Sequence, residues 1–309
     1  MKENLPANSD KKQNPHGKSS RASRFSGSTN YINIRNTKFL FNDYISVNIK
    51  SLTLKAISHE PGNFFDLDDV DSYTFNIIGG EVTLDLSVME NIFNKYVLKG
   101  ASLKNFSFST LPGEKDNRMF VIKGEIKLAA SLPFTMTAMM KLDNPNNLIV
   151  ITADNIKMMG ILPADKFMGM VGLSLENLFR IPQGRGVVCQ DNSLMIKPLS
   201  LLPLPRIIGK LHTVKLEEKR IIISFEQMEK VSIPPRPAPE AVNDLFLFGG
   251  DVKIGQSRYM NMNIQILDRD KEDVFEFHIK NYFKHVSRST IGFPHVNTLI
   301  ISTLSYSRL

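Results

Sequence analysis

The chain has 309 residues, of which 42% are hydrophobic and 22% charged, and its formal net charge is +7. This composition is typical of a globular protein and excludes a chain that is disordered throughout. A single cysteine excludes a disulfide scaffold, and no apolar run reaches the roughly 18 residues that a transmembrane helix needs.

The positive charge is concentrated at the N-terminus. Residues 1–30 carry six basic and two acidic side chains, a net +4, whereas the other 279 residues carry 32 basic and 29 acidic side chains, a net +3. A nucleic-acid-binding domain needs a dense basic face, so we expect no nucleic-acid partner. We expect residues 1–30 to form a disordered tail, which either is simply solvated or contacts an anionic membrane peripherally.

The same N-terminal residues contain no apolar stretch of the kind that a secretory signal needs. The expected location is therefore cytoplasmic by default, and periplasmic if the start of the chain is mis-assigned.

From Tyr31 onward the hydrophobic pattern has a period of two residues. Apolar and polar side chains alternate over 39–54 and 73–84, which predicts strands with one wet face, as in an antiparallel sheet. Breaks in the spacing between 41 and 45, and again after 49, predict bends or bulges in a long strand. Gly79-Gly80 is expected to interrupt the strand at 73–84.

A helix is predicted at about 87–98. Ser87 and Glu90 form a capping-box pattern, and Gly100 supplies a stop. A single apolar stripe at helical spacing should pack on a sheet. The residues of this stripe are Met89, Ile92, Phe93, Tyr96 and Val97.

An antiparallel meander is predicted next, because short turns rich in Pro, Gly, Asp and Asn separate four apolar segments. These segments are 103–110, 119–129, 134–142 and 148–158. A second helix is predicted over 164–180, and its apolar residues cover most of its circumference, so it is either buried nearly all round or lies in an apolar groove. Later strands are predicted at 186–189, 194–199, 210–216 and 221–225.

Two connections differ from ordinary loops. Residues 201–205 (Leu-Leu-Pro-Leu-Pro) form an apolar loop, which is unusual on a surface. Residues 233–239 are rich in proline and should form a stiff extended connection. Beyond it we predict strands at 251–255, 260–267 and 298–304 and a helix at 273–286.

These elements predict four parts of the chain. The expected parts are a disordered basic tail (1–30), a curved-sheet domain (31–228), a Pro-rich connection (229–240) and a strand-helix-strand extension that packs on the main sheet (241–309).

The search for catalytic groups is negative. The six histidines form no metal-binding pair at i, i+4, and His278 fits a hydrogen-bonded core residue. Cys189 lies in an apolar strand and should be an inert buried thiol. The acidic run 66–71 lacks the glycine and glutamate of a calcium-binding loop, so we interpret it as a solvated loop. We expect no enzyme, no metal and no cofactor.

Methionine is the one unusual signal. Seven of the 14 methionines lie within residues 136–170. Methionine is flexible and polarizable, so such a cluster either fills a core or lines a groove for acyl chains, with loop 201–205 at its mouth. The ligand-binding residues predicted from this cluster and from the 164–180 helix are Met136, Met139, Met140, Met158, Met159, Phe167, Met168, Met170, Val171, Leu175 and Phe179.

The order of elements over residues 40–227 resembles a known superfamily. A strand leads into a short amphipathic helix, and a meander, an apolar helix and further strands follow. With the segments 80–87 and 186–196, this order resembles the bacterial single-module members of the tubular lipid-binding superfamily, relatives of bactericidal/permeability-increasing protein. The absence of a signal peptide and the C-terminal extension depart from that pattern.

The resemblance implies an α+β fold in which a large, highly curved antiparallel sheet wraps one or two apolar helices and encloses a lipid site without catalytic residues. We therefore expect non-enzymatic binding, or transfer, of a lipid or other long apolar ligand in a groove between sheet and helix. The alternative is a structural or interaction module that docks a protein partner through a sheet edge or the apolar loop.

Overall fold

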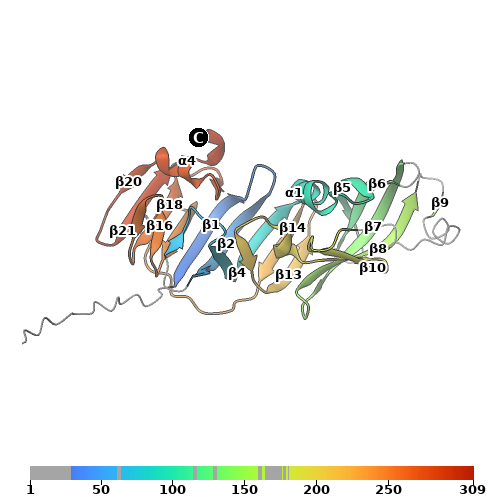
Figure 1. The fold of residues 1–309 in the computed structure, drawn as a ribbon, viewed down its shortest axis with the longest axis horizontal. Coiled ribbons are helices and arrows are strands. Elements are labelled where there is room, and N and C mark those ends of the chain that lie inside the picture. Colours follow the sequence, from blue (N-terminus) through green and yellow to red (C-terminus); the bar gives the residue numbers. More distant parts are fainter. Residues whose placement is uncertain are drawn as a thin grey trace, which may run out of the picture.

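The computed structural model describes residues 29–60, 64–113, 117–127, 131–158, 162–163, 176, 179 and 181–309, with only the backbone at 162–163. The molecule is elongated and consists mostly of β-sheet with few helices (Figure 1). The strands of the described residues form sheets of eleven, seven and three members. The predicted tail, apart from Thr29 and Asn30, and the predicted 164–180 helix, apart from Glu176 and Phe179, lie outside the described residues.

The eleven-stranded sheet has the order β13-β14-β4-β2-β1-β15-β18-β21-β20, and β12 also pairs with β4 and β19 with β1. Its strands are β1 (Asn30–Leu40), β2 (Ser46–Ser58), β4 (Tyr73–Asp85), β12 (Arg206–Ile208), β13 (Leu211–Leu216), β14 (Arg220–Phe225), β15 (Asp244–Phe248), β18 (Asn263–Asp268), β19 (Phe275–His278), β20 (Thr290–Gly292) and β21 (Thr298–Thr303). The C-terminal strands therefore extend the sheet that contains β1.

The period-two segments are confirmed as strands, but two details differ. The break between 41 and 45 is the turn of the hairpin β1–β2 rather than a bend within one strand, whereas the break after 49 is a bulge of β2 against β4. Strand β4 continues through Gly79-Gly80. Gly80 has φ +132°, and a Cβ there would lie 2.3 Å from the carbonyl oxygen of Ser51, so glycine allows β2 to approach closely.

The predicted antiparallel meander is confirmed. The seven-stranded sheet has the order β10-β11-β8-β7-β6-β5, with β9 beside β8. Its strands are β5 (Leu103–Pro112), β6 (Arg118–Lys127), β7 (Ser131–Asp143), β8 (Leu148–Met158), β9 (Leu162–Pro163), β10 (Val187–Gln190) and β11 (Ser193–Ile196). The small sheet contains β3 (Phe65–Asp66), β16 (Val252–Ile254) and β17 (Ser257–Tyr259).

The first predicted helix is confirmed, but its cap is not. Helix α1 (Leu86–Ile92) continues into the π-helical turn η1 (Phe93–Val97). The N-cap is Asp85, without a side-chain hydrogen bond, so the capping box at Ser87 does not form. The carboxylate of Glu90 instead accepts a hydrogen bond of 2.8 Å from the backbone of Phe108, because β5 presents an amide there.

The helix predicted at 273–286 is wrong in its first half. Residues 275–278 form β19, which pairs in parallel with β1 from Thr37 to Leu40, and only α4 (Tyr282–Ser287) is helical. On the same β1, β15 pairs with residues 31–35. The second half of β1 thus gains its hydrogen-bonding partner from β19, and this tertiary pairing overrides the helical spacing. Two further short helices in the described residues are η2 (Pro198–Leu201) and η3 (Tyr306–Arg308).

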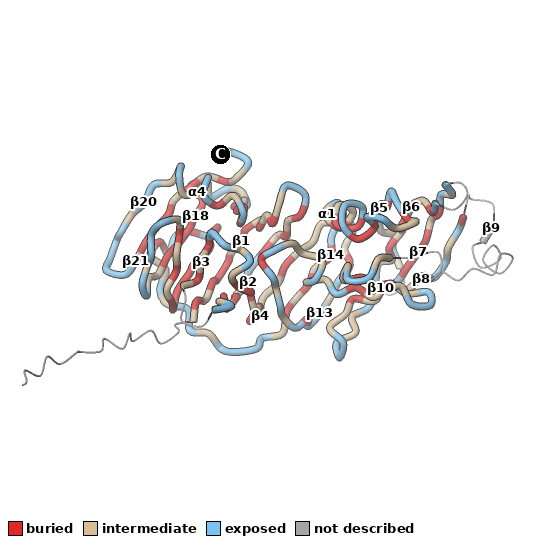
Figure 2. The backbone as a smooth tube through the Cα atoms, viewed as in Figure 1, coloured by how far each residue is buried: buried red, intermediate tan, exposed pale blue. Residues whose placement is uncertain are grey.

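One continuous cluster of buried apolar side chains includes residues of all three sheets. Figure 2 shows buried residues along the strands over the whole length of the molecule. Within the described ranges, no helix has the length and apolar character needed to span a bilayer. The boundaries at 1–30, 229–240 and 241–309 stay a prediction.

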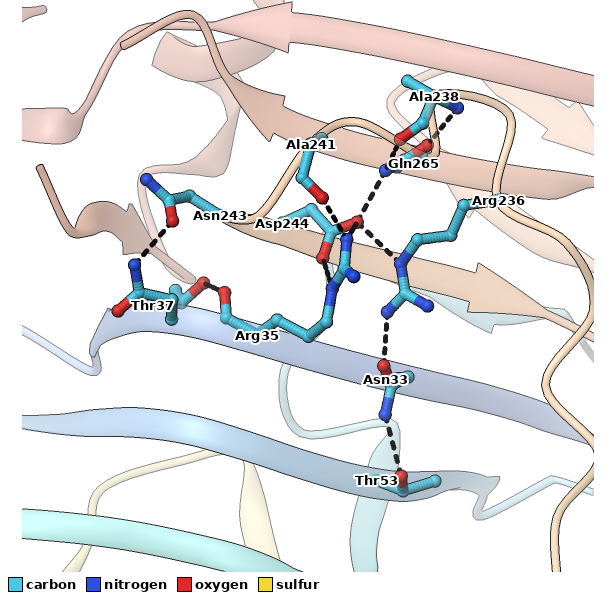
Figure 3. A network of polar contacts seen from close by, with 11 residues as sticks. Asn33, Arg35, Thr37, Thr53, Arg236, Ala238, Ala241, Asn243, Asp244 and Gln265 are labelled. Atoms are coloured by element: carbon cyan, nitrogen blue, oxygen red, sulfur yellow. Dashed lines mark hydrogen bonds and ion pairs between the residues drawn. The ribbon is translucent and has the colours of Figure 1, made fainter. Parts of the chain in front are cut away.

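A buried carboxylate links the Pro-rich connection to the large sheet (Figure 3). Asp244, on β15, is fully buried. Arg35 on β1 donates to its two oxygens over 2.8 and 3.0 Å, Arg236 donates over 2.9 Å, and Gln265 on β18 donates over 2.6 Å. These charged hydrogen bonds compensate the loss of hydration of the carboxylate.

The partners of Asp244 extend the network on both sides. Gln265 also donates to the carbonyl of Ala238 and accepts from its backbone amide, over 3.0 and 2.7 Å. Arg236 donates to the Asn33 side chain, which in turn donates to Thr53 over 2.9 Å. The connection expected to be only a stiff spacer is therefore anchored to β1 and β18.

Asp244→Asn should destabilise the fold by about 3 kcal/mol, because it leaves two arginines beside a buried neutral group. Urea denaturation followed by circular dichroism measures this change. As a matched control, Glu217→Gln removes a carboxylate that binds Lys215 and Arg220 on the surface and should leave the midpoint unchanged. Equal midpoints for the Asp244 variant and the unchanged protein would contradict the role of the network.

Candidate functional site

An apolar cavity of about 60 Å³ lies where the two large sheets meet. The large sheet contributes β2, β4, β13 and β14, the helix α1–η1 closes one side, and β8, β11 and the segment 198–202 close the others. Its lining residues are Val47, Val82, Leu84, Met89, Ile92, Phe93, Ile149, Ile151, Ile196, Pro198, Leu199, Leu201, Leu202, Leu211, Ile221, Ile223 and Phe225.

Two smaller apolar cavities lie beside the first. A second cavity of about 40 Å³ shares five lining residues with it, and a third of about 20 Å³ shares four with the second. The first shared set is Val47, Val82, Leu199, Leu202 and Phe225, and the second is Ile34, Phe39, Leu54 and Phe75. Because neighbouring cavities share walls, the three form one series, which we call the apolar row.

The apolar row crosses the strands of the large sheet. Its first cavity lies against β13 and β14, and its third lies against β1, β15 and β18. These strands follow one another along the long axis of the molecule (Figure 1). The row therefore has the extended shape that suits a linear molecule.

The segment 198–202 forms a wall of both larger cavities. Leu199 and Leu202 line both, and Leu201 lines the first. The three side chains are half-buried, whereas most strand residues that line these cavities are buried. Loop 201–205 thus turns its first leucines inward and exposes Leu204, which explains the apolar composition noted in the sequence.

The chemistry of the row is uniform. Among the described residues that line the three cavities, every side chain is apolar. Such a lining offers no nucleophile, acid or base, and its interaction with a ligand is the removal of hydrocarbon from water, worth about 0.8 kcal/mol for each methylene. The arrangement is suited to holding an apolar molecule.

The described residues of the methionine cluster do not line the apolar row. Met136, Met158 and Phe179 are buried, Met140 is half-buried and Met139 is exposed. None of these five lines the three cavities. The other predicted ligand-binding residues, Met159, Phe167, Met168, Met170, Val171 and Leu175, lie outside the described residues, so the ligand-binding role of the cluster stays a prediction.

Phe179 belongs to a group of packed aromatic rings. Its ring lies edge-on to Phe134, with 5.4 Å between centroids, and to Phe106 at 6.2 Å. Met136 and Phe134 alternate with exposed or half-buried neighbours on β7 and so point to the same buried face. In this part of the seven-stranded sheet, the buried methionine shares its face with a closely packed aromatic core.

The other reactive groups have structural partners. Cys189 is half-buried rather than fully buried as expected; desolvation, followed by the charges of Glu176 and Asp191, raises the pKa of its thiol to about 11, which keeps it protonated. In the acidic run, Asp66 pairs with Lys253 at 2.6 Å. Across the described ranges, no three His, Cys, Asp or Glu side chains are grouped closely enough to hold a metal ion.

Two histidines are buried near the C-terminus. His278 is hydrogen-bonded and buried as expected, although it lies on β19 rather than on a helix. Nε2 of His285 accepts from the backbone amide of His278 at 3.3 Å, and Nδ1 donates to the carbonyl of Leu304 at 3.2 Å. Burial lowers the pKa of His285 to about 4 and also lowers the pKa of His278, against the opposing charge of Asp43.

No protein-family model, curated protein or solved structure matches the chain in comparisons with known proteins.

The neutral state of His285 should make stability depend on pH. Because its folded pKa lies below its unfolded value of about 6.5, the unfolded state binds more protons, and stability falls as the pH drops from about 6.5 toward 4. We expect a loss of about 2 kcal/mol between pH 7 and pH 5, measured by urea denaturation.

His285→Gln keeps a donor and an acceptor but does not titrate, so its stability should depend less on pH over the same range. His212→Gln, at an exposed position, should keep the dependence of the unchanged protein. An identical slope in the His285 variant would show that other groups cause the effect.

Proposed function

We propose that this protein binds, without catalysis, a lipid or another molecule with a long apolar chain, and that the apolar row is the binding site. The observation that carries the proposal is the series of three neighbouring cavities with an entirely apolar lining of described residues. The resemblance to the tubular lipid-binding superfamily over residues 40–227 points in the same direction.

Binding requires the row to widen. The cavities, of about 60, 40 and 20 Å³, are too small for a complete acyl chain, so the ligand must displace a wall. The segment 198–202 is the wall best suited to move, because its leucines are half-buried and its only regular structure is the short helix η2. Burying ten methylenes contributes about 8 kcal/mol before the costs of ordering and displacement.

In the fuller form of the proposal, the large sheet curves around the apolar chain of the ligand. Outward movement of 198–202 would then load and release the ligand, as transfer requires. The inward-facing leucines favour this role of the loop over docking of a protein partner, the alternative that the sequence leaves open.

Protein purified under native conditions should carry a lipid that organic extraction releases and mass spectrometry identifies. Val82→Phe fills the space shared by the first two cavities and should lower the amount of bound lipid several-fold. Val188→Phe, at an exposed site on β10, is the matched control and should retain it. The proposal would be contradicted if the natural protein carried no lipid after native purification and its three cavities were closed.

A double substitution in the segment 198–202 distinguishes lipid binding from docking of a protein partner. Leu201→Ser with Leu202→Ser removes apolar contacts from the cavity side and should reduce bound lipid, because hydrocarbon would then face hydroxyl groups. The measurement is the lipid-to-protein ratio after native purification. Unchanged lipid together with loss of a captured protein partner would favour the interaction module instead.

A further inference from the structure

A basic side chain joins two of the elements that close the first cavity of the apolar row. Arg185 precedes β10, and its guanidinium donates to the backbone carbonyl of Tyr96 in η1 at 2.8 Å. The next residue, Gly186, lies against the segment 198–202, since a Cβ on this glycine would be 3.0 Å from the side chain of Leu201. Arg185 therefore lies at the seam between the helix α1–η1 and the wall 198–202.

A second basic side chain lies at the same end of the hairpin β10–β11. The backbone of Lys197 donates to the carbonyl of Gly186 at 2.8 Å, and Lys197 immediately precedes the segment 198–202. Lys197 is exposed and Arg185 is half-buried. The acidic residue of the hairpin, Asp191, lies in the turn at its other end. Positive charge is thus gathered beside the wall of the first cavity.

This charge is not neutralised by the described residues. The ion pairs between described residues include neither Arg185 nor Lys197. The guanidinium of Arg185 has five N–H donors, and one of them serves the carbonyl of Tyr96. A guanidinium binds carboxylate and phosphate groups through paired donors, so Arg185 retains donors that suit an anionic group.

We infer that the ligand of the apolar row is an amphiphile with an anionic headgroup, and that Arg185 and Lys197 bind this headgroup outside the cavity. The inference rests on the proposed function. The apolar lining of the row accepts hydrocarbon but offers no partner for a charge, so a charged headgroup stays at the edge of the row. At the seam beside 198–202 the two charges are positive, which favours carboxylate or phosphate over ammonium.

The test compares three ligands of equal chain length that differ at the headgroup: dodecanoate, dodecyl phosphate and dodecanol. Isothermal titration calorimetry of the full chain at pH 8, below the micellar concentration, measures each dissociation constant. We expect both anions to bind about tenfold more tightly than dodecanol, and added salt to reduce this difference. Inorganic phosphate alone should not bind measurably, because it brings no hydrocarbon to the row.

Two variants assign the preference to the basic pair. Arg185→Gln with Lys197→Gln should weaken the binding of both anions about tenfold and leave dodecanol binding unchanged, which also shows that the variant is folded. Arg185→Lys keeps the charge and should retain most of the affinity for the anions. Lys123→Gln with Lys127→Gln removes two exposed charges from β6 and should leave all three dissociation constants unchanged.

The outcomes separate the headgroup preference from lipid binding itself. Equal affinities of the natural protein for dodecanoate and dodecanol would overturn the inference and leave the proposed function intact. If none of the three ligands bound, the proposed function would fail and the inference with it. An equal loss of dodecanol and dodecanoate binding in the Arg185/Lys197 double variant would also overturn the inference, because the two residues would then support the wall rather than bind the headgroup.

Discussion

The charged cluster around Asp244 holds the two ends of the chain in one sheet. Without compensation, a fully buried carboxylate would oppose folding, and Arg35, Arg236 and Gln265 supply that compensation from β1, the Pro-rich connection and β18. The cluster thereby fixes β15 beside β1. Leu245 and Leu247 of β15 line the third cavity, so the length of the apolar row depends on this polar contact.

Polar and apolar interactions are separated along the molecule. The ion pairs of Asp244 and the hydrogen bonds of His278 and His285 lie in the C-terminal part, where they fix the positions of strands and a short helix. The first cavity of the apolar row lies between the two large sheets and the second lies between the eleven-stranded sheet and Leu199 and Leu202, and the lining of both is apolar. Paired strands on one side and the half-buried segment 198–202 on the other enclose the first two cavities of the row.

The alternation of apolar and polar residues was sufficient to predict most strands and the meander, because in a strand this pattern indicates which face is buried. Helical spacing succeeded at 87–98 but failed at 275–278, where pairing with β1 decides the conformation. The site was harder to predict. Burial of Val47, Val82 and Ile223 could be expected from alternation, but whether their face is filled or leaves space depends on packing across two sheets. The only sequence signal near the row was the run of leucines at 201–204.

The pairing of β1 also has a kinetic consequence. Its register joins residues 31–35 to 244–248 and residues 37–40 to 275–278, contacts that span more than two hundred positions. Contacts of such long range slow folding, and the corresponding edge of β1 stays open until the C-terminal strands have been synthesised. During that interval the nascent chain exposes the same backbone groups that drive aggregation of unpaired edges. Completion of this sheet thus requires that residues 244–278 have been synthesised.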